Sequence, residues 1–150
     1  MVMAKLIQTT SEKVVYIYDG NMDPDNVDFK NAGIVEFDYC VFEKAPNTID
    51  AMYLFQNMED NHIRIIKEPV TKDVNEFGID TLPFNIFREI LKKYNAYKSI
   101  PDFAVYLTPE FLQEALQKDE VKEMFIDNNI ASKEAIEDFL EDVQKQPGKH

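Results

Sequence analysis

The sequence is poor in cysteine and glycine, and each shortage excludes a class of structure. Its 150 residues include one cysteine, Cys40, so no disulfide can form within the chain. A lone cysteine in a strand-like segment is typical of a small buried hydrophobe, and cysteine-poor chains are typical of reducing compartments. The four glycines are not grouped, so the chain has no glycine-rich loop for cradling phosphate.

Long apolar segments are also missing. The longest uninterrupted ones, residues 14–18 and 51–55, are far shorter than the roughly 20 residues that a membrane-spanning helix needs. Residues 1–8 lack the apolar region of a secretory signal. We therefore expect a soluble, cytoplasmic protein that does not engage a membrane.

Basic residues are outnumbered by acidic ones, 16 to 28, and the net charge of −12 is distributed unevenly. Residues 1–46 balance at −4, residues 47–107 at −2 and residues 108–150 at −6. A negative surface repels phosphate backbones, so direct binding to nucleic acid is disfavoured. The densest basic cluster is short and is expected to flank one helix: Arg88, Lys92, Lys93 and Lys98.

Bulky apolar residues, including 11 Phe and 7 Tyr, supply the core of a globular chain. Strand-like segments come early, at residues 5–9, 13–18, 34–42 and 63–67, and helical periodicity dominates later. This order predicts an α+β fold in which an N-terminal, mainly antiparallel sheet is packed by helices and the C-terminal third is helical. We expect a single α+β domain over residues 1–150, with residues 108–145 as a candidate helical subdomain.

Helix starts are marked by capping residues. Thr48, Thr108 and Ser132 are expected to cap three helices, and Pro83 is expected in the first turn of a fourth. In the last helix, four apolar residues recur at helical spacing: Ile136, Phe139, Leu140 and Val143.

Residues for nucleophilic, acid–base or zinc chemistry are scarce. The two histidines are His62, at an expected junction of turn and strand, and the terminal His150. No serine lies in a nucleophile elbow, and one cysteine with two histidines offers no paired zinc spacing. We therefore predict no catalytic residue, no metal and no cofactor. Glu36 and Asp38 share one face of an expected strand, which leaves a carboxylate-based, metal-dependent enzyme as a third hypothesis.

An acidic stretch at residues 19–28 supplies carboxylates at alternate positions, as calcium-binding loops do. Pro24 stands where such loops need a glycine, and Lys30 where they need a closing glutamate. A second partial match, around Asp73 and Gly78, has Phe84 at the closing position. Both segments are interpreted as turns rich in Asp and Asn, with cation binding by the first left open.

The last expected helix carries a continuous acidic edge opposite its apolar stripe. Like charges four residues apart cost helix stability, which favours a use for them. Our first hypothesis is therefore a non-enzymatic protein–protein interaction module for a basic or nucleic-acid-binding partner, acting as an inhibitor or nucleic-acid mimic. A solvated face that keeps the protein soluble is the alternative. The predicted partner-binding residues are Glu134, Glu137, Asp138, Glu141 and Asp142.

The second hypothesis is a structural or adaptor subunit of a larger, phage-like assembly. Aromatic residues are enriched at protein interfaces, and four tyrosines are expected near the edges of elements. Such a subunit self-associates or docks through apolar contacts that tolerate salt. The four tyrosines are Tyr16, Tyr18, Tyr94 and Tyr97.

Overall fold

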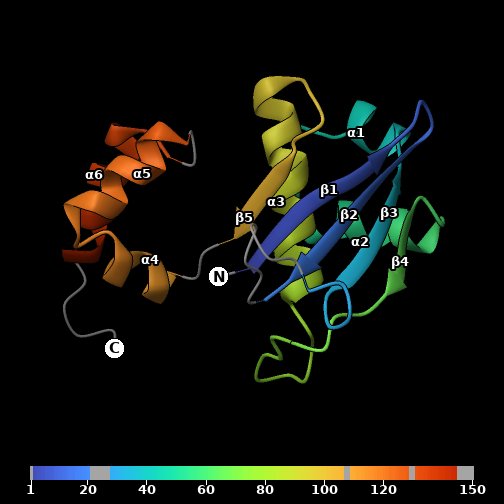
Figure 1. The fold of residues 1–150 in the computed structure, drawn as a ribbon, viewed down its shortest axis with the longest axis horizontal. Coiled ribbons are helices and arrows are strands. Elements are labelled where there is room, and N and C mark those ends of the chain that lie inside the picture. The colour runs from blue at the N-terminus through green and yellow to red at the C-terminus, as the bar shows by residue number, and fades with distance from the viewer. Residues whose placement is uncertain (1, 21–27, 107–108, 129–130, 145–150) are drawn as a thin grey trace. The chain divides into compact units, whose positions relative to one another are not determined.

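The computed structural model describes residues 2–20, 28–106, 109–128 and 131–144. The chain divides into two compact units, an N-terminal unit of residues 1–106 and a C-terminal unit of residues 107–150. The first contains a sheet with helices, and the described part of the second is helical (Figure 1). The predicted α+β fold is confirmed, whereas the assignment of residues 1–150 to a single domain stays a prediction.

Five strands of the N-terminal unit form an antiparallel sheet in the order β4-β3-β2-β1-β5. The strand-like segments predicted from the sequence correspond to four of them, and the 63–67 strand lies where it was expected. A tight turn joins the first two strands, and in it the Thr10 hydroxyl accepts a hydrogen bond from the Lys13 N–H at 3.0 Å. The strands are β1 (Val2–Thr9), β2 (Lys13–Asp19), β3 (Gly33–Asp38), β4 (Ile63–Lys67) and β5 (Phe103–Tyr106).

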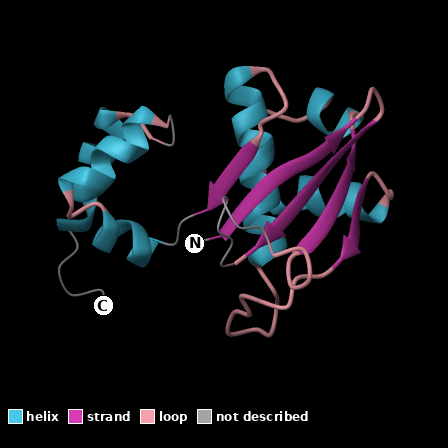
Figure 2. Cartoon of the chain, viewed as in Figure 1, coloured by secondary structure: helices cyan, strands magenta, loops and turns pink. Residues whose placement is uncertain are grey.

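Three helices pack on one face of this sheet (Figure 2): α1 (Cys40–Glu43), α2 (Ala51–Glu59) and α3 (Leu82–Tyr97). Helix α3 presents an apolar stripe at helical spacing, from Leu82 to Leu91, to the sheet. Its Phe87 lies edge-on to Tyr18 and Phe37, with ring centroids 5.2 and 5.4 Å away. The main core of the unit therefore lies between the sheet and α3.

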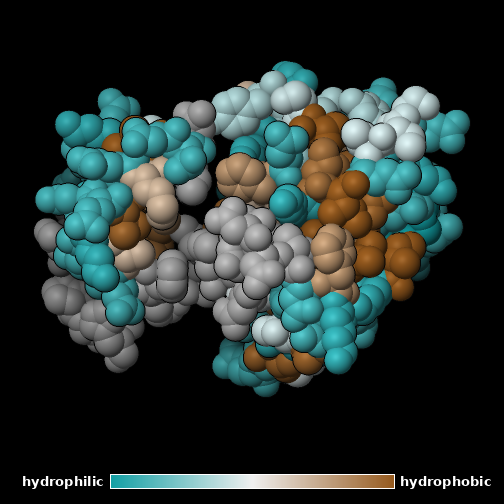
Figure 3. Space-filling model, in the orientation of Figure 1, coloured by the Kyte–Doolittle hydropathy of each residue, from teal (hydrophilic) through white to brown (hydrophobic). Residues whose placement is uncertain are grey.

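The opposite face of the sheet carries a smaller apolar group. Met3 and Ile17 are buried there together with Ala32, and Val105 packs against them. Apolar side chains gather over the strands on the face that Figure 3 shows. Charged residues, among them Lys13, Glu36 and Arg64, occupy this face near the C-terminal end of β3.

Residues 40–43 form a helical turn, although alternation predicted a strand that continues to residue 42. In a strand, Val41 and Phe42 would point to opposite faces of the sheet. In helix α1 both are buried in the core. Burial of both apolar side chains outweighs the local strand pattern. Likewise Asp50, not Thr48, caps α2, because its carboxylate accepts a hydrogen bond from the Tyr53 N–H at 2.9 Å.

Two of the four tyrosines proposed for an interface are core residues instead. Tyr16 and Tyr18 lie on β2, the central strand, and are 0% and 1% exposed. The Tyr16 hydroxyl donates to the Pro101 carbonyl at 2.6 Å, and burial raises the pKa of both phenols. Tyr94 is half-buried against the core, and Tyr97 is exposed. The strand pattern placed Tyr16 and Tyr18 correctly in a strand, but it did not identify that strand, β2, as the centre of the sheet.

The C-terminal unit contains α4 (Pro109–Ala115), α5 (Asp119–Asp127) and α6 (Lys133–Gln144). Its buried core consists of Leu116, Phe125 and Ile136, with partly buried residues such as Phe139 and Leu140 around them. Ser132 caps α6 as predicted, since its hydroxyl accepts a hydrogen bond from the Ala135 N–H at 3.1 Å. The predicted cap at Thr108 and the side chain of Val143 lie outside the described residues.

Across the parts of both units that the structure describes, no helix is long and apolar enough to cross a membrane.

Candidate functional site

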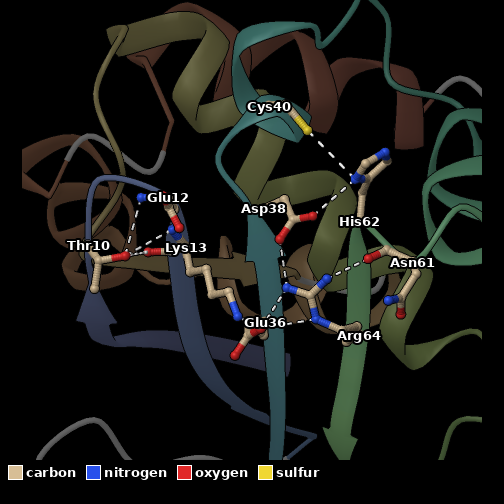
Figure 4. Close-up of polar contacts among 9 residues, drawn as sticks. All are labelled: Thr10, Glu12, Lys13, Glu36, Asp38, Cys40, Asn61, His62 and Arg64. Carbon is tan, nitrogen blue, oxygen red and sulfur yellow. Dashed lines mark hydrogen bonds and ion pairs between the residues drawn. The ribbon is translucent and has the colours of Figure 1, made fainter.

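A charged network lies on the sheet face opposite the helices (Figure 4). Because Val35 and Phe37 of β3 point into the core, Glu36 and Asp38 point outward. The antiparallel register places Arg64 of β4 directly beside Glu36. The network comprises Lys13, Glu36, Asp38, His62 and Arg64.

Arg64 holds the two carboxylates of this network together. Its Nη2 lies 2.6 Å from Glu36 Oε1 and 2.7 Å from Asp38 Oδ1, and its Nε donates to Glu36 Oε1 at 3.0 Å. Lys13 adds an ion pair to Glu36 at 3.3 Å. These hydrogen bonds, led by those from Arg64, hold the pKa of both carboxyls below the ordinary range. The carboxylates that suggested a metal-dependent enzyme are thus engaged by cations of the chain itself.

His62 joins this network to the cysteine. Its Nδ1 lies 3.0 Å from Asp38 Oδ2 and 3.8 Å from Cys40 Sγ. In a catalytic Cys–His–Asp arrangement, the nucleophile and the carboxylate contact opposite ring nitrogens. Here both contact the same one, so when Nδ1 donates to Asp38 it has no lone pair for the thiol proton. The geometry therefore fits a positioning contact and not an activated nucleophile.

The sequence pattern predicted Cys40 as a buried residue of a strand. Cys40 instead begins α1 and is half-buried, and His62 is 22 residues away along the chain. Both strands were predicted, and their pairing brings His62 next to Asp38. The contact of His62 with Cys40 could therefore have been found only from the pairing of β3 with β4.

The Asp-rich segments form turns in the described residues. Asp28 accepts hydrogen bonds from the backbone N–H groups of Lys30 and Asn31, while residues 21–27 lie outside the description. Asn75 Oδ1 accepts from the N–H groups of Phe77 and Ile79, which is an Asx-type turn. Within the described ranges, no group of three or more His, Cys, Asp and Glu side chains could hold a metal ion.

The predicted partner-binding residues lie together on α6, and all five are exposed. They form two rows with four-residue spacing: Glu134, Asp138 and Asp142 in one row, and Glu137 and Glu141 in the other. The last turn, as far as it is described, has no basic residue. The dipole of α6 favours Glu134, which lies in the first turn, whereas acids near the C-terminal end of a helix oppose its dipole.

A surface groove of about 310 Å³ lies between α5 and α6, and the sequence did not predict it. Each helix lines it with four residues at the spacing i, i+3, i+4, i+7, which is one face of a helix. Its apolar part is formed by Ile126, Ile136 and Leu140, of which Ile126 is 38% exposed and Ile136 only 4%. The remaining lining is charged: Asp119, Lys122, Glu123, Lys133 and Glu137. Because Glu137 belongs to both, the groove borders the acidic edge.

No protein-family model matches the sequence, and no curated protein or solved structure is significantly similar to it.

Proposed function

We propose that the chain is a non-enzymatic protein-interaction module that binds a basic partner through its C-terminal unit. The observation that carries this proposal is the acidic edge of α6 beside a groove with an apolar floor. Residues 107–150 hold five basic and eleven acidic residues, a balance of −6 on 44 residues. Such a density of one sign attracts a partner of the other sign and accelerates its association.

The cost of the acidic edge supports a role beyond solubility. Glu134, Asp138 and Asp142 follow one another at four-residue spacing, and each such pair of like charges destabilises a helix by roughly 0.2–0.5 kcal/mol. Mixed charges would keep the same surface soluble without this cost. Repulsion within α6 is relieved when a cationic surface covers the row.

A specific form of the proposal is an inhibitor that mimics nucleic acid. Carboxylates of one row follow each other about 6 Å apart along the helix axis, given a rise of about 1.5 Å per residue. A protein that binds phosphate backbones presents Lys and Arg side chains, which pair with carboxylates through charge-assisted hydrogen bonds. Binding of this kind weakens steeply with salt.

A second candidate function, a structural or adaptor subunit, is favoured by the loop at residues 68–80 of the N-terminal unit. This loop exposes four large apolar side chains within ten residues, and Phe77, the most exposed, is 79% accessible. Apolar side chains clustered in water are typical of docking surfaces. The other three are Val70, Val74 and Ile79.

Affinity capture with charge-matched variants tests the proposal. Native cell lysate is passed over the wild-type chain and over two variants, each with five exposed acids replaced by the corresponding amides, and the captured proteins are identified. One variant changes the acidic edge: Glu134→Gln, Glu137→Gln, Asp138→Asn, Glu141→Gln and Asp142→Asn. The control changes five exposed acids of the N-terminal unit: Glu12→Gln, Glu43→Gln, Glu59→Gln, Asp73→Asn and Glu76→Gln.

A basic partner that the wild-type and control chains retain at low salt, and that the edge variant loses, supports the proposal. The same partner should leave the wild-type chain at high salt. Partners that all three proteins retain at high salt would instead support the structural or adaptor function, because apolar docking tolerates salt.

A further inference from the structure

The α5–α6 groove has the chemistry of a peptide site. Pockets for small molecules are lined predominantly by apolar and aromatic side chains and range from roughly 300 to 1,000 Å³. This groove is at the lower end of that range, and five of its eight lining residues are charged. A narrow apolar floor between charged rims can accommodate one or two apolar side chains of an otherwise polar peptide. It fits a wholly apolar small molecule less well.

The floor of the groove is preformed. Ile136 belongs to the buried core of the C-terminal unit, and Leu140 packs against that core. Ile126 of α5 is the exposed wall, at 38% accessibility. An apolar side chain placed here would extend the core of the unit without a rearrangement of its helices.

The charged residues around the floor favour an occupant that carries positive charge. Lys122 is already paired with Asp119, Nζ to Oδ1 at 3.7 Å, so its charge is offset within the rim. Glu123 on α5 and Glu137 on α6 add negative charge to opposite sides of the groove, and with Lys133 on α6 the lining holds three acidic and two basic residues. The acidic edge continues from Glu137 away from the groove along α6. Positive charge on an occupant therefore has favourable partners along both helices.

We propose that this groove binds an amphipathic basic helix of the partner protein. Apolar side chains of that helix lie on Ile126, Ile136 and Leu140, and its Lys and Arg side chains pair with Glu123, Glu137 and the acidic edge. An amphipathic helix binds in a groove of this kind through apolar anchors at i, i+3, i+4 and i+7 of its own sequence. This inference rests on the proposed function, because it identifies the part of a basic partner that the C-terminal unit recognises.

Two synthetic peptides of equal charge separate the apolar contribution from the electrostatic one. The first is an amphipathic helix of lysine and leucine, and in the second every leucine is replaced by glutamine. Each is titrated into the full chain at low ionic strength and followed by fluorescence anisotropy. We expect the leucine peptide to bind about tenfold more tightly, which is the equivalent of burying about two methylene groups.

Two substitutions on α5 provide a matched pair. Ile126→Asn polarises the groove, and Met124→Asn makes a similar change two residues earlier, where Met124 is 49% exposed and does not line the groove. Both residues are exposed, so both variants should fold, which far-UV circular dichroism checks. The preference for the leucine peptide should disappear in Ile126→Asn and persist in Met124→Asn.

The outcomes separate this inference from the proposed function. If both peptides bind and the preference survives Ile126→Asn, the groove is not the binding site, although a basic partner still fits the acidic edge. If neither peptide binds, the proposed function fails as well. A concentration-dependent dimer in sedimentation equilibrium that Ile126→Asn abolishes would assign the groove to a second copy of the chain and overturn the inference.

Discussion

The two compact units carry the same net charge on very different numbers of residues. The N-terminal unit has eleven basic and seventeen acidic residues in 106, and the C-terminal unit has five and eleven in 44, so each balances at −6. On the sheet of the first unit, Glu36 and Asp38 are held by Arg64. On α6 of the second, Glu134, Asp138 and Asp142 stand in one row at four-residue spacing. Two acids of the first unit are thus paired with a cation of the fold, whereas this row of α6 places like charges next to one another.

The two units also differ in the side chains that form their buried cores. Large aromatic side chains such as Tyr16, Phe37 and Phe87 are fully buried in the N-terminal unit. Among the described residues of the C-terminal unit, the buried core consists of Leu116, Phe125 and Ile136. Chains of about 40 residues are marginal when they must build a core alone. The smaller unit therefore carries the greater density of negative charge.

The largest expected loss of stability comes from a substitution in the core of the N-terminal unit. Phe87→Ala removes a fully buried ring that contacts Tyr18 and Phe37, and should lower the free energy of unfolding by about 3–5 kcal/mol. The matched control is Phe77→Ala, at a side chain 79% exposed, which should change it by less than about 0.5 kcal/mol. Urea unfolding followed by tyrosine fluorescence measures both. Equal losses would mean that the 68–80 loop packs as core.

A smaller effect tests whether the charged network stabilises the N-terminal unit. Arg64→Met removes the cation that lowers the pKa of Glu36 and Asp38, and should cost about 1 kcal/mol at neutral pH, since the three side chains are only 20–28% exposed. Lys92→Met, in an exposed pair with Glu89, is the control and should cost less than about 0.5 kcal/mol. Thermal unfolding at several pH values measures the difference.

The dependence on pH has a definite sign. The pKa of both carboxyls is lower in the folded chain than in the unfolded one, where it is about 4. Their contribution is therefore complete above about pH 5 and is lost as the pH falls through the folded-state values. The gap between wild type and Arg64→Met should shrink on acidification, whereas the small effect of Lys92→Met should stay nearly constant. A gap independent of pH would show that Arg64 acts through packing of its stem alone.

Local patterns predicted the elements whose evidence lies within a few residues. The strand at residues 63–67 follows from a short apolar run, and the cap at Ser132 follows from a hydroxyl just before a periodic stretch. The acidic edge could also be predicted, because a helix fixes which residues share a face. These features depend on backbone geometry that neighbouring residues decide.

Features that depend on pairing between distant segments were missed. Arg64 and Glu36 are 28 residues apart, and they meet through the register of β3 with β4. The contact of His62 with Cys40 has the same origin. The helical turn at residues 40–43 follows from burial of Phe42 in the main core. The distant segments that form this core cannot be inferred from the local strand pattern. The groove depends on the packing of α5 on α6.

The smallest expected effect sharpens the comparison between the units. Asp138 lies four residues from both Glu134 and Asp142, so Asp138→Lys converts two repulsive spacings on α6 into attractive ones. We expect a gain of about 0.5 kcal/mol in helix stability at low salt, which shrinks as salt screens the charges. Glu12→Lys makes the same change of charge at an exposed turn of the N-terminal unit and should have little effect.

Stability and binding should move in opposite directions in this variant. Asp138→Lys should unfold at a higher temperature than the wild type and bind the lysine–leucine peptide more weakly, because the substitution removes repulsion and negative charge together. Glu12→Lys should bind the peptide nearly as the wild type does. A gain in stability with unchanged affinity would make the acidic edge a solvated face. A loss of stability would mean that Asp138 supports α6, and the contrast between an acidity that serves the fold and one that serves binding would no longer hold.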